Sequence, residues 1–294
     1  MTLEMSTNKK ALASVAELQS EPWQEVMEEI NKIARPTGLL EYSTYSRIWE
    51  YPWVWFHLKP LRRQDIRVLD IGSEKSPFPW FLATQGFDVM VSDKSAHYWR
   101  LWHQASRQLK VAVDRRVLDG ENLDLTAASV DVYLSVSVLE HVSNKTKLIS
   151  EAARVLRPGG LLIMTFDICQ PEMGMTFPEW NGQAPTMEGF DDLFRRSPWF
   201  ESGLSHLPWN TQDIPEYISW HRATASHHNY VTGAALILRN KRLWVETAWK
   251  DRVKRFKGQI RTTSFVAMMY LQQGKRVPGR AIARLSESLF KNHR

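Results

Sequence analysis

Hydrophobic positions between Arg67 and Phe166 follow two alternating patterns. Short apolar runs rich in β-branched residues, which are typical of buried strands, alternate with segments of helical apolar spacing. The apolar runs predict strands at 67–71, 88–92, 115–118, 130–135 and 161–166, and helices near 79–85, 96–108 and 145–156 lie between them. Strands and helices in this alternation predict an α/β fold with a parallel, doubly wound sheet.

The flanking segments extend this pattern. Helical spacing covers residues 12–34, where Pro22 favours two shorter helices, and an aromatic segment follows before the first strand. Downstream, residues 187–194 look helical, and strands at 200–207 and 230–238 would bring the mostly parallel sheet to seven strands. Residues 208–229, rich in Trp, His and Tyr, have no clear pattern and are predicted to form a loop that acts as a lid, because long loops are usually functional.

Length and pattern together favour one α/β domain with additions over two independent domains. We expect an N-terminal helical and aromatic cap at 1–60, the α/β domain at 61–240 with its lid at about 208–229, and a C-terminal extension at 241–294. The extension is basic. Residues 250–294 carry twelve Lys or Arg and two acids, whereas the net charge of the whole chain is +6.

This charge asymmetry has two interpretations. The basic segment could face an anionic partner, which would be a membrane surface, a phosphate-bearing carrier or nucleic acid, or it could simply be a solvated face. The single cysteine, Cys169, suits a reducing compartment. No secretory signal or membrane-spanning run is apparent, so we expect a cytoplasmic protein that the basic segment could hold at a membrane surface.

The chemistry-bearing signal is a glycine turn followed by a carboxylate. The first strand ends in Val68-Leu-Asp-Ile-Gly72, and the second ends at Asp93, about twenty residues later. Gly72 lets the backbone approach a ligand closely, and an acid at this spacing accepts hydrogen bonds from ribose hydroxyls. A nucleoside-containing cofactor is therefore indicated.

Five motifs together resemble one family. They run in order through the part of the chain between residues 67 and 166, and they are Val68-Leu-Asp-Ile-Gly72, Asp93, Leu118-Asp-Gly-Glu-Asn-Leu123, Val130-Asp-Val-Tyr-Leu-Ser-Val-Ser-Val-Leu-Glu-His141 and Arg154-Val-Leu-Arg-Pro-Gly-Gly160. In this order and spacing they are similar to the class I S-adenosylmethionine-dependent methyltransferases, particularly the small-molecule group that includes the ubiquinone-biosynthesis type. The resemblance implies a Rossmann-like methyltransferase fold and S-adenosyl-L-methionine as cofactor.

The resemblance also implies roles for residues at the strand ends. Asp70 and Gly72 would wrap the methionine part of the cofactor, and Asp93 would bind the ribose hydroxyls. Asp119 and Gly120 would hold the adenine amino group. Ser135 would line the side of the cofactor that carries the sulfonium. For Asp70 and Asp119, a purely structural role as turn or cap carboxylates remains an alternative.

One departure from the family pattern concerns the glycine turn. The family commonly continues Gly-x-Gly-x-Gly, but the second and third glycines are Glu74 and Ser76 here. Glu74 would crowd or repel the carboxylate of the cofactor. Lys75 would offset this repulsion as a flexible cation. The alternative is a degraded site that binds the cofactor poorly.

Catalytic and acceptor-binding residues are less clearly marked. An oxygen nucleophile usually needs a general base, most often histidine, and the candidates are His141 after the fourth strand and His221 and His228 in the predicted lid. Each has a structural alternative as a packing, capping or surface residue. The aromatic candidates for the acceptor pocket are Tyr45, Trp209, Tyr217 and Trp220. No residue pattern resembles a metal site.

Three functions remain open from the sequence. The first is methyl transfer to an O or N nucleophile of a small or carrier-linked biosynthetic intermediate, such as a secondary metabolite, a sugar or a lipid-linked acceptor. The second is methylation of nucleic acid with the help of the basic segment; it is less favoured, because Ser135-Val-Ser-Val does not match the signatures of amino-methylating DNA enzymes. The third is a non-catalytic scaffold with a methyltransferase fold, for which Glu74 is the main argument.

Overall fold

The computed structural model describes residues 8–44, 46–62, 65–169, 184–200, 204, 206–225 and 230–239, all within one compact unit, Met1–Lys241. In this part of the chain one sheet has the strand order β1-β7-β6-β5-β2-β3-β4. Its strands are β1 (Lys9–Leu12), β2 (Arg67–Ile71), β3 (Asp88–Asp93), β4 (Val113–Val117), β5 (Val130–Val136), β6 (Leu156–Cys169) and β7 (Tyr230–Leu238). The helices are α1 (Val15–Gln19), α2 (Glu21–Thr37), α3 (Arg47–Leu58), α4 (Phe78–Thr84), α5 (Trp99–Leu109), α6 (Lys145–Val155), α7 (Met187–Arg195) and α8 (Ile214–Ala225).

The sheet is mostly parallel. Strands β2 to β6 pair in parallel, β7 pairs antiparallel to β6, and β1 pairs antiparallel to β7. All seven residues of β5 are buried, as expected for a strand covered on both faces, and this burial explains its continuous apolar run. The predicted seven-stranded α/β fold is confirmed.

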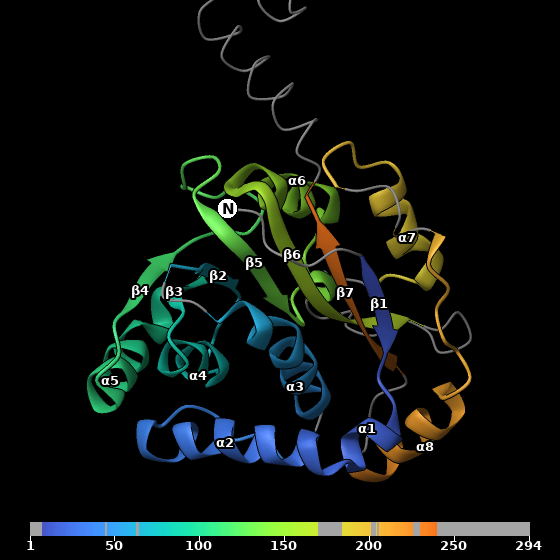
Figure 1. Ribbon diagram of the computed structural model, residues 1–294, viewed down its shortest axis with the longest axis horizontal. Helices are drawn as coiled ribbons and strands as arrows, with labels where there is room; N and C mark the ends of the chain where they lie inside the picture. The colour runs from blue at the N-terminus through green and yellow to red at the C-terminus, as the bar shows by residue number, and fades with distance from the viewer. Residues whose placement is uncertain are drawn as a thin grey trace, which may run out of the picture. The chain divides into compact units, whose positions relative to one another are not determined.

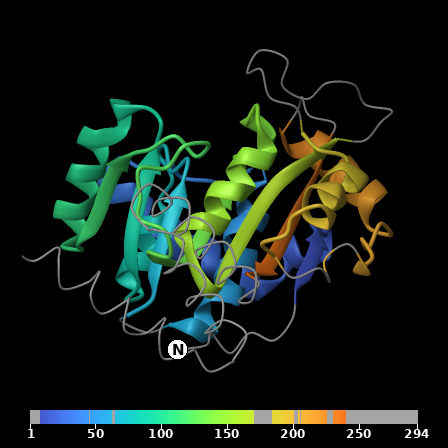
Figure 2. The same ribbon diagram turned by 90° about the horizontal axis from the view of Figure 1, so that it is seen from above.

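The edge strand β1 corrects one prediction. It comes from the N-terminus, whereas we expected the remaining strand at residues 200–207. Within that segment, Phe200 forms only an isolated bridge with Arg239, and Leu204 and His206 lie in 3-10 turns. Strand β1 lies beside β7, which comes from the far end of the described chain (Figures 1 and 2).

A buried lysine explains why β1 was missed. The Lys10 ammonium is fully buried and pairs with Asp191 of α7, with a Nζ–Oδ1 distance of 2.7 Å. Lysine is almost never fully buried unless it is paired, so its presence argued against a strand in the sheet.

The predicted lid is also corrected. Residues 214–225 form α8 and not a loop, and the Tyr217 side chain is fully buried against the sheet. Its hydroxyl lies 2.9 Å from the Thr232 Oγ1 of β7. The helix therefore packs on β7 through its aromatic face.

The cap helices pack against one another and against the helices of the sheet. Helix α2 contacts α3, α4 and α5, and it lies along the lower edge of the molecule in Figure 1. Most of the aromatic segment is core, because Trp49, Trp53 and Trp55 of α3 are buried. Their role is therefore to pack the cap on the domain.

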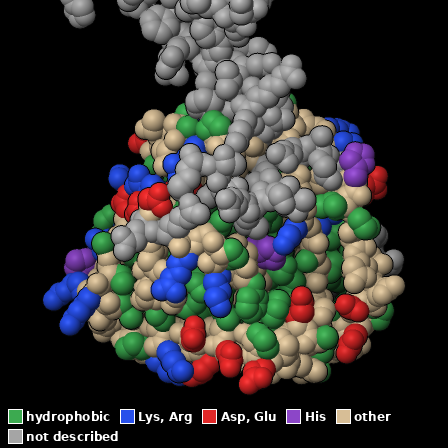
Figure 3. All heavy atoms as spheres, in the orientation of Figure 1, with side chains coloured by type: hydrophobic (Ala, Val, Ile, Leu, Met, Phe, Trp, Pro, Cys, Tyr) green, Lys and Arg blue, Asp and Glu red, His purple; other side chains and the backbone are tan. Residues whose placement is uncertain are grey.

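The surface of the described part differs in charge from the basic segment. Acidic side chains gather along the lower edge in Figure 3, where α2 exposes four glutamates, Glu21, Glu25, Glu28 and Glu29. The basic segment 250–294 lies outside the described residues. Among the helices that the structure describes, none is long and apolar enough to span a bilayer.

Candidate functional site

The glycine turn after β2 is fastened to the end of β3. Gly72 has a φ of 70°, and a Cβ at this position would lie 2.6 Å from Val138 Cγ2. The Ser73 N–H donates to the Ser92 carbonyl at 2.9 Å, and the Ser92 hydroxyl donates to the Asp70 carbonyl at 2.9 Å. The turn therefore needs glycine, and its hydrogen bonds hold it beside the carboxyl end of β3.

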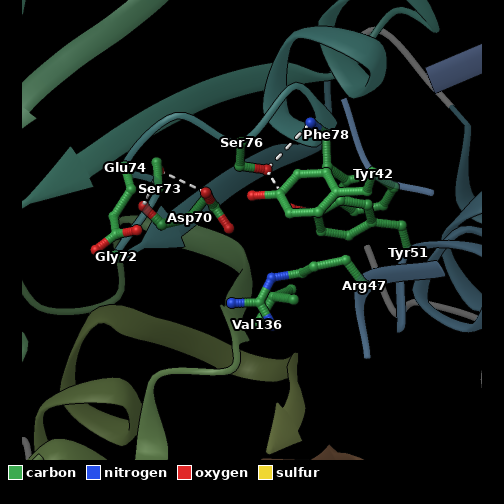
Figure 4. Close-up of a pocket in the computed structure, with 10 residues that line it drawn as sticks. All are labelled: Tyr42, Arg47, Tyr51, Asp70, Gly72, Ser73, Glu74, Ser76, Phe78 and Val136. Atoms are coloured by element: carbon green, nitrogen blue, oxygen red, sulfur yellow. Dashed lines mark hydrogen bonds between the residues drawn. The ribbon is translucent and has the colours of Figure 1, made fainter. Parts of the chain in front are cut away.

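A pocket opens beside this turn (Figure 4). Its lining comes from the cap, from the turn and from the end of β5, and comprises Tyr42, Arg47, Tyr51, Asp70, Gly72, Ser73, Glu74, Ser76, Phe78 and Val136. Of the predicted cofactor residues, Asp70 and Gly72 therefore line the pocket. Asp93 is buried at the end of β3, next to the turn, and its Oδ1 accepts from the Ser95 N–H at 2.8 Å.

Arg47 is a pocket residue that the sequence analysis missed. Its side chain reaches from α3 into the pocket (Figure 4), where it pairs with Glu50, with an Nη1–Oε2 distance of 2.7 Å. It also donates to the Ser137 hydroxyl, which itself donates to Glu50 Oε1 at 2.7 Å. The available signal was an arginine and a glutamate inside an otherwise aromatic and apolar segment, because such charges are buried only when they are paired.

The acids of the pocket are perturbed by burial. Burial raises the pKa of Asp70 to about 7, although the Ser73 hydroxyl and Arg47 act in the opposite direction. The pKa of Glu74 is also raised, first by burial and then by the charge of Asp93. The pocket therefore holds acids that a cationic ligand would favour in the ionised form.

Glu74 occupies the second glycine position of the family pattern with a left-handed backbone. Its φ is 42°, a region that glycine adopts more readily. The Trp102 indole donates to its carbonyl at 2.7 Å, which helps to hold this conformation. The carboxylate lines the pocket, and the charge of Arg47 acts against the rise in its pKa.

Four other predicted cofactor residues lie away from the pocket lining. Lys75 is exposed and does not line the pocket, although its charge, like that of Arg47, acts against the rise in the pKa of Glu74. Asp119 is exposed, and its Oδ1 accepts from the Glu121 N–H at 2.9 Å, as a turn carboxylate does. A Cβ on Gly120 would lie 2.7 Å from Leu148 Cδ1. Ser135 is fully buried, and its hydroxyl has no hydrogen-bond partner in the described ranges.

The candidate histidines fall in different environments. His141 ends a 3-10 turn, Leu139–His141, after β5 and is partly exposed. His221 is fully buried in α8, with its ring centroid 5.7 Å from that of Tyr217. The structure therefore corrects the expectation that His221 lies on a lid, while His228 lies outside the described residues.

Three of the predicted acceptor-binding aromatics, Trp209, Tyr217 and Trp220, are described, and they lie outside the lining of the pocket. Trp209 packs on Phe190, with ring centroids 5.8 Å apart, and the Lys10 ammonium lies 4.6 Å from its ring centroid. Tyr217 and Trp220 are neighbours on α8, 5.9 Å apart. These three residues take part in the packing of α7, α8 and β1, and their role in binding the acceptor stays a prediction. Tyr45 lies outside the described residues.

Strand register extends the site across the sheet. In the pairings, Asp70 lies opposite Leu134, Val136 opposite Thr165, and Asp167 opposite Thr232. Because side chains alternate between faces, Asp70, Val136 and Asp167 share the face that carries the pocket. Buried polar side chains thus continue from the pocket toward β7.

Glu140 belongs to the same buried group. It is fully buried, and burial raises its pKa to about 8, with a further increase from the charge of Glu50. The pKa of Asp167 is likewise raised, by burial and then by Glu140 and Glu50. Within the part of the chain that the structure describes, no group of three or more His, Cys, Asp or Glu is arranged to hold a metal ion.

A glycine turn fastened to a strand-terminal acid, at the carboxyl edge of a parallel sheet, is typical of proteins that bind a nucleoside-containing cofactor. Comparison with known proteins identifies the family. Residues 69–164 match the model of the methyltransferase domain. Residues 69–164 therefore form a methyltransferase domain, and the predicted resemblance to methyltransferases is confirmed for this part of the chain.

The similar proteins cover this domain. A ubiquinone biosynthesis O-methyltransferase of Agrobacterium fabrum is 33% identical over 99 residues, which are 34% of this chain and 40% of the relative. A 27-O-demethylrifamycin SV methyltransferase of Amycolatopsis mediterranei is 38% identical over 109 residues, 36% of this chain and 39% of the relative. The chain thus matches about two fifths of the length of these curated relatives.

One solved structure shows the same fold. It is geranyl diphosphate C-methyltransferase from Streptomyces coelicolor, solved in complex with Mg²⁺, geranyl diphosphate and S-adenosyl-L-homocysteine. Its TM-score is 0.50 at 13% identity, and the alignment covers 76% of this chain and 98% of that chain.

Proposed function

We propose that the protein transfers a methyl group from S-adenosyl-L-methionine to an O or N nucleophile of a small or carrier-linked biosynthetic intermediate. The observation that carries this proposal is the pocket beside Gly72. Gly72 has no side chain to block a ligand, Asp93 lies next to the turn, and Arg47 reaches into the pocket. These features suit a zwitterionic nucleoside ligand. The methyltransferase relatives of the domain support the reaction type.

Individual residues have distinct tasks in this proposal. Asp70 and the backbone around Gly72 would hold the methionine part, and the Arg47 guanidinium would pair with its carboxylate as a planar, permanent cation. Asp93 would accept from the ribose hydroxyls. The cofactor supplies the activated methyl group, so the protein mainly aligns the acceptor and excludes water.

The acceptor class rests on the relatives and not on a pocket of this chain. Two of the similar proteins methylate small molecules, by their names a ubiquinone precursor and a demethylrifamycin. A small-molecule or carrier-linked acceptor is therefore proposed. A membrane or phosphate-bearing partner for residues 250–294 stays a prediction, and no described feature favours nucleic acid.

Calorimetric titration with S-adenosylmethionine and S-adenosylhomocysteine tests the cofactor. We expect saturable binding in the micromolar range, which corresponds to about −8 kcal/mol at 1 μM. Asp93→Ala should abolish it, whereas Asp88→Ala, at the exposed start of the same strand, should leave it unchanged. No binding by the intact chain, or equal binding by Asp93→Ala, would contradict the proposal.

A further inference from the structure

A second cavity lies at the other end of α3 from Arg47. It measures about 270 Å³, and it is lined by residues 8–11 at the start of β1, by Trp53 and His57 of α3, and by Leu207 and Pro208. None of these residues lines the pocket beside Gly72. Ligand sites typically measure roughly 300–1,000 Å³, so a cavity of this size suits a small molecule.

The cavity is separate from the proposed cofactor site. Arg47 and His57 lie near opposite ends of α3, which places their Cα atoms about 15 Å apart along the helix. At the sheet, Lys9 pairs with Leu236, which pairs with Ile163, well before the carboxyl end of β6 at Cys169. Methyl transfer needs the reacting atoms about 3–3.5 Å apart. A group held in this cavity is therefore not the one that would be methylated.

His57 leaves one ring nitrogen for a ligand. Its Nδ1 lies 2.8 Å from the Trp53 carbonyl, and because a carbonyl only accepts, Nδ1 carries the hydrogen. Its Nε2 makes no hydrogen bond with the described residues. Burial lowers the pKa of His57, and so does the charge of Lys9, whereas the bond to the Trp53 carbonyl acts in the opposite direction. At neutral pH the ring is therefore neutral, and its Nε2 can take up a proton beside an anion.

The charges and walls of the cavity favour an anion with an apolar body. Lys10 is paired with Asp191, so its charge is balanced inside the protein. Lys9 is exposed and forms no ion pair with the described residues, which leaves one uncompensated cation at the rim. The Trp53 ring and residues 207 and 208 supply apolar walls. One free cation and one proton acceptor match the single charge and the two oxygens of a carboxylate.

We propose that this cavity binds a small carboxylate with an apolar body, one oxygen facing the Lys9 ammonium and the other facing His57 Nε2. His57 takes up one proton from solvent as the ligand binds, so the bound carboxylate faces two cations. Among the described residues, the other titratable groups at the cavity are Lys9 and Lys10 with its partner Asp191, and of these Lys9 acts on His57. The inference goes beyond the proposed methyl transfer and does not depend on it, because the two sites share no lining residue.

Benzoate is the probe for this site, and benzamide, which has nearly the same shape but no charge, is the matched control. The chain has nine histidines, so the NMR signal of the His57 ring is assigned by its absence in His57→Phe. An excess of benzoate should raise the pKa of His57 by about 1–3 units, because an opposite charge then lies beside the ring. Benzamide should leave this pKa unchanged. The affinity for benzoate should accordingly fall as pH rises from 6 to 8.

Substitutions of exposed lysines separate this site from general attraction of anions. Lys9→Gln should weaken benzoate binding at least roughly tenfold, the loss expected for one hydrogen bond to a charged group. Lys59→Gln, also exposed and close to His57 in the chain, should leave it unchanged. Asp93→Ala, which should lose the cofactor, should still bind benzoate. An unshifted pKa of His57, equal effects of benzoate and benzamide, full affinity in Lys9→Gln, or loss of benzoate binding in Asp93→Ala would overturn the proposal.

Discussion

Replacing Gly72 by alanine adds one methyl group at a position that resists it for two reasons. The backbone φ is 70°, which costs an L residue roughly 1–2 kcal/mol. The new Cβ would lie 2.6 Å from Val138 Cγ2, and overpacking of this kind typically costs about 1–3 kcal/mol. Together these terms predict a loss of roughly 2–5 kcal/mol in the free energy of unfolding.

Gly86→Ala is the matched control. Gly86 has a φ of 93°, but a Cβ there would meet no atom within 4 Å. Urea unfolding of the two variants should therefore differ by the packing term alone, about 1–3 kcal/mol. In a Val138→Ala background, where the colliding methyl groups are gone, Gly72→Ala should cost no more than Gly86→Ala does in the intact chain.

Ligand binding separates the two positions further. Gly72 lines the pocket and Gly86 does not, so Gly72→Ala should weaken binding of S-adenosylhomocysteine, whereas Gly86→Ala should leave it unchanged. The reasoning would be refuted by equal destabilisation of the two variants, or by full ligand affinity in a folded Gly72→Ala protein.

Three further variants test other parts of the site. Arg47→Met leaves Glu50 buried without its cation, so urea unfolding should show a loss of about 3 kcal/mol and calorimetry a weaker affinity for S-adenosylhomocysteine; unchanged affinity would exclude Arg47 from the pocket's function. The pKa of Asp70 is raised in the fold from 3.8 to about 7, so its contribution to stability is complete below about 4 and is lost as pH rises through 7. Asp70→Asn should therefore flatten the fall in unfolding free energy between pH 4 and 8, and an unaltered slope would contradict the assignment. Tyr217→Phe removes a buried hydrogen bond to Thr232 and should cost about 1–2 kcal/mol by urea unfolding, so a neutral effect would show that the bond is not formed.

The centre of the sheet was predictable because burial there is continuous. Every residue of β5 is buried, and so are four of the five residues of β2, so their sequences read as apolar runs bounded by turns. The edge was not predictable in the same way. In β1, Lys9 and Lys10 hide a strand, because the partner that makes Lys10 acceptable, Asp191, lies far along the chain.

The same difference between local and distant sequence signals applies to the residues of the site. Asp70 and Gly72 were found because their motif is local. Arg47 was not, since it lies on α3, outside the motif, and nothing in the sequence shows that its side chain reaches the pocket. The lid was misjudged for another reason: Tyr217 and His221 are four residues apart, which is a helical spacing, but the length of the patternless stretch was given more weight than this pair.

Glu74 and Arg47 show how the cap and the sheet depend on each other. An acid at a glycine position would by itself weaken a site for a ligand that carries a carboxylate. Here the fold brings a guanidinium from α3 into the same pocket, where its charge acts on Glu74 as well as on Asp70. The matched methyltransferase region, residues 69–164, contains the acid but not this cation. Within that region only Lys75, which is exposed, acts on Glu74 in the same direction, so the cation that lines the proposed cofactor site comes from α3.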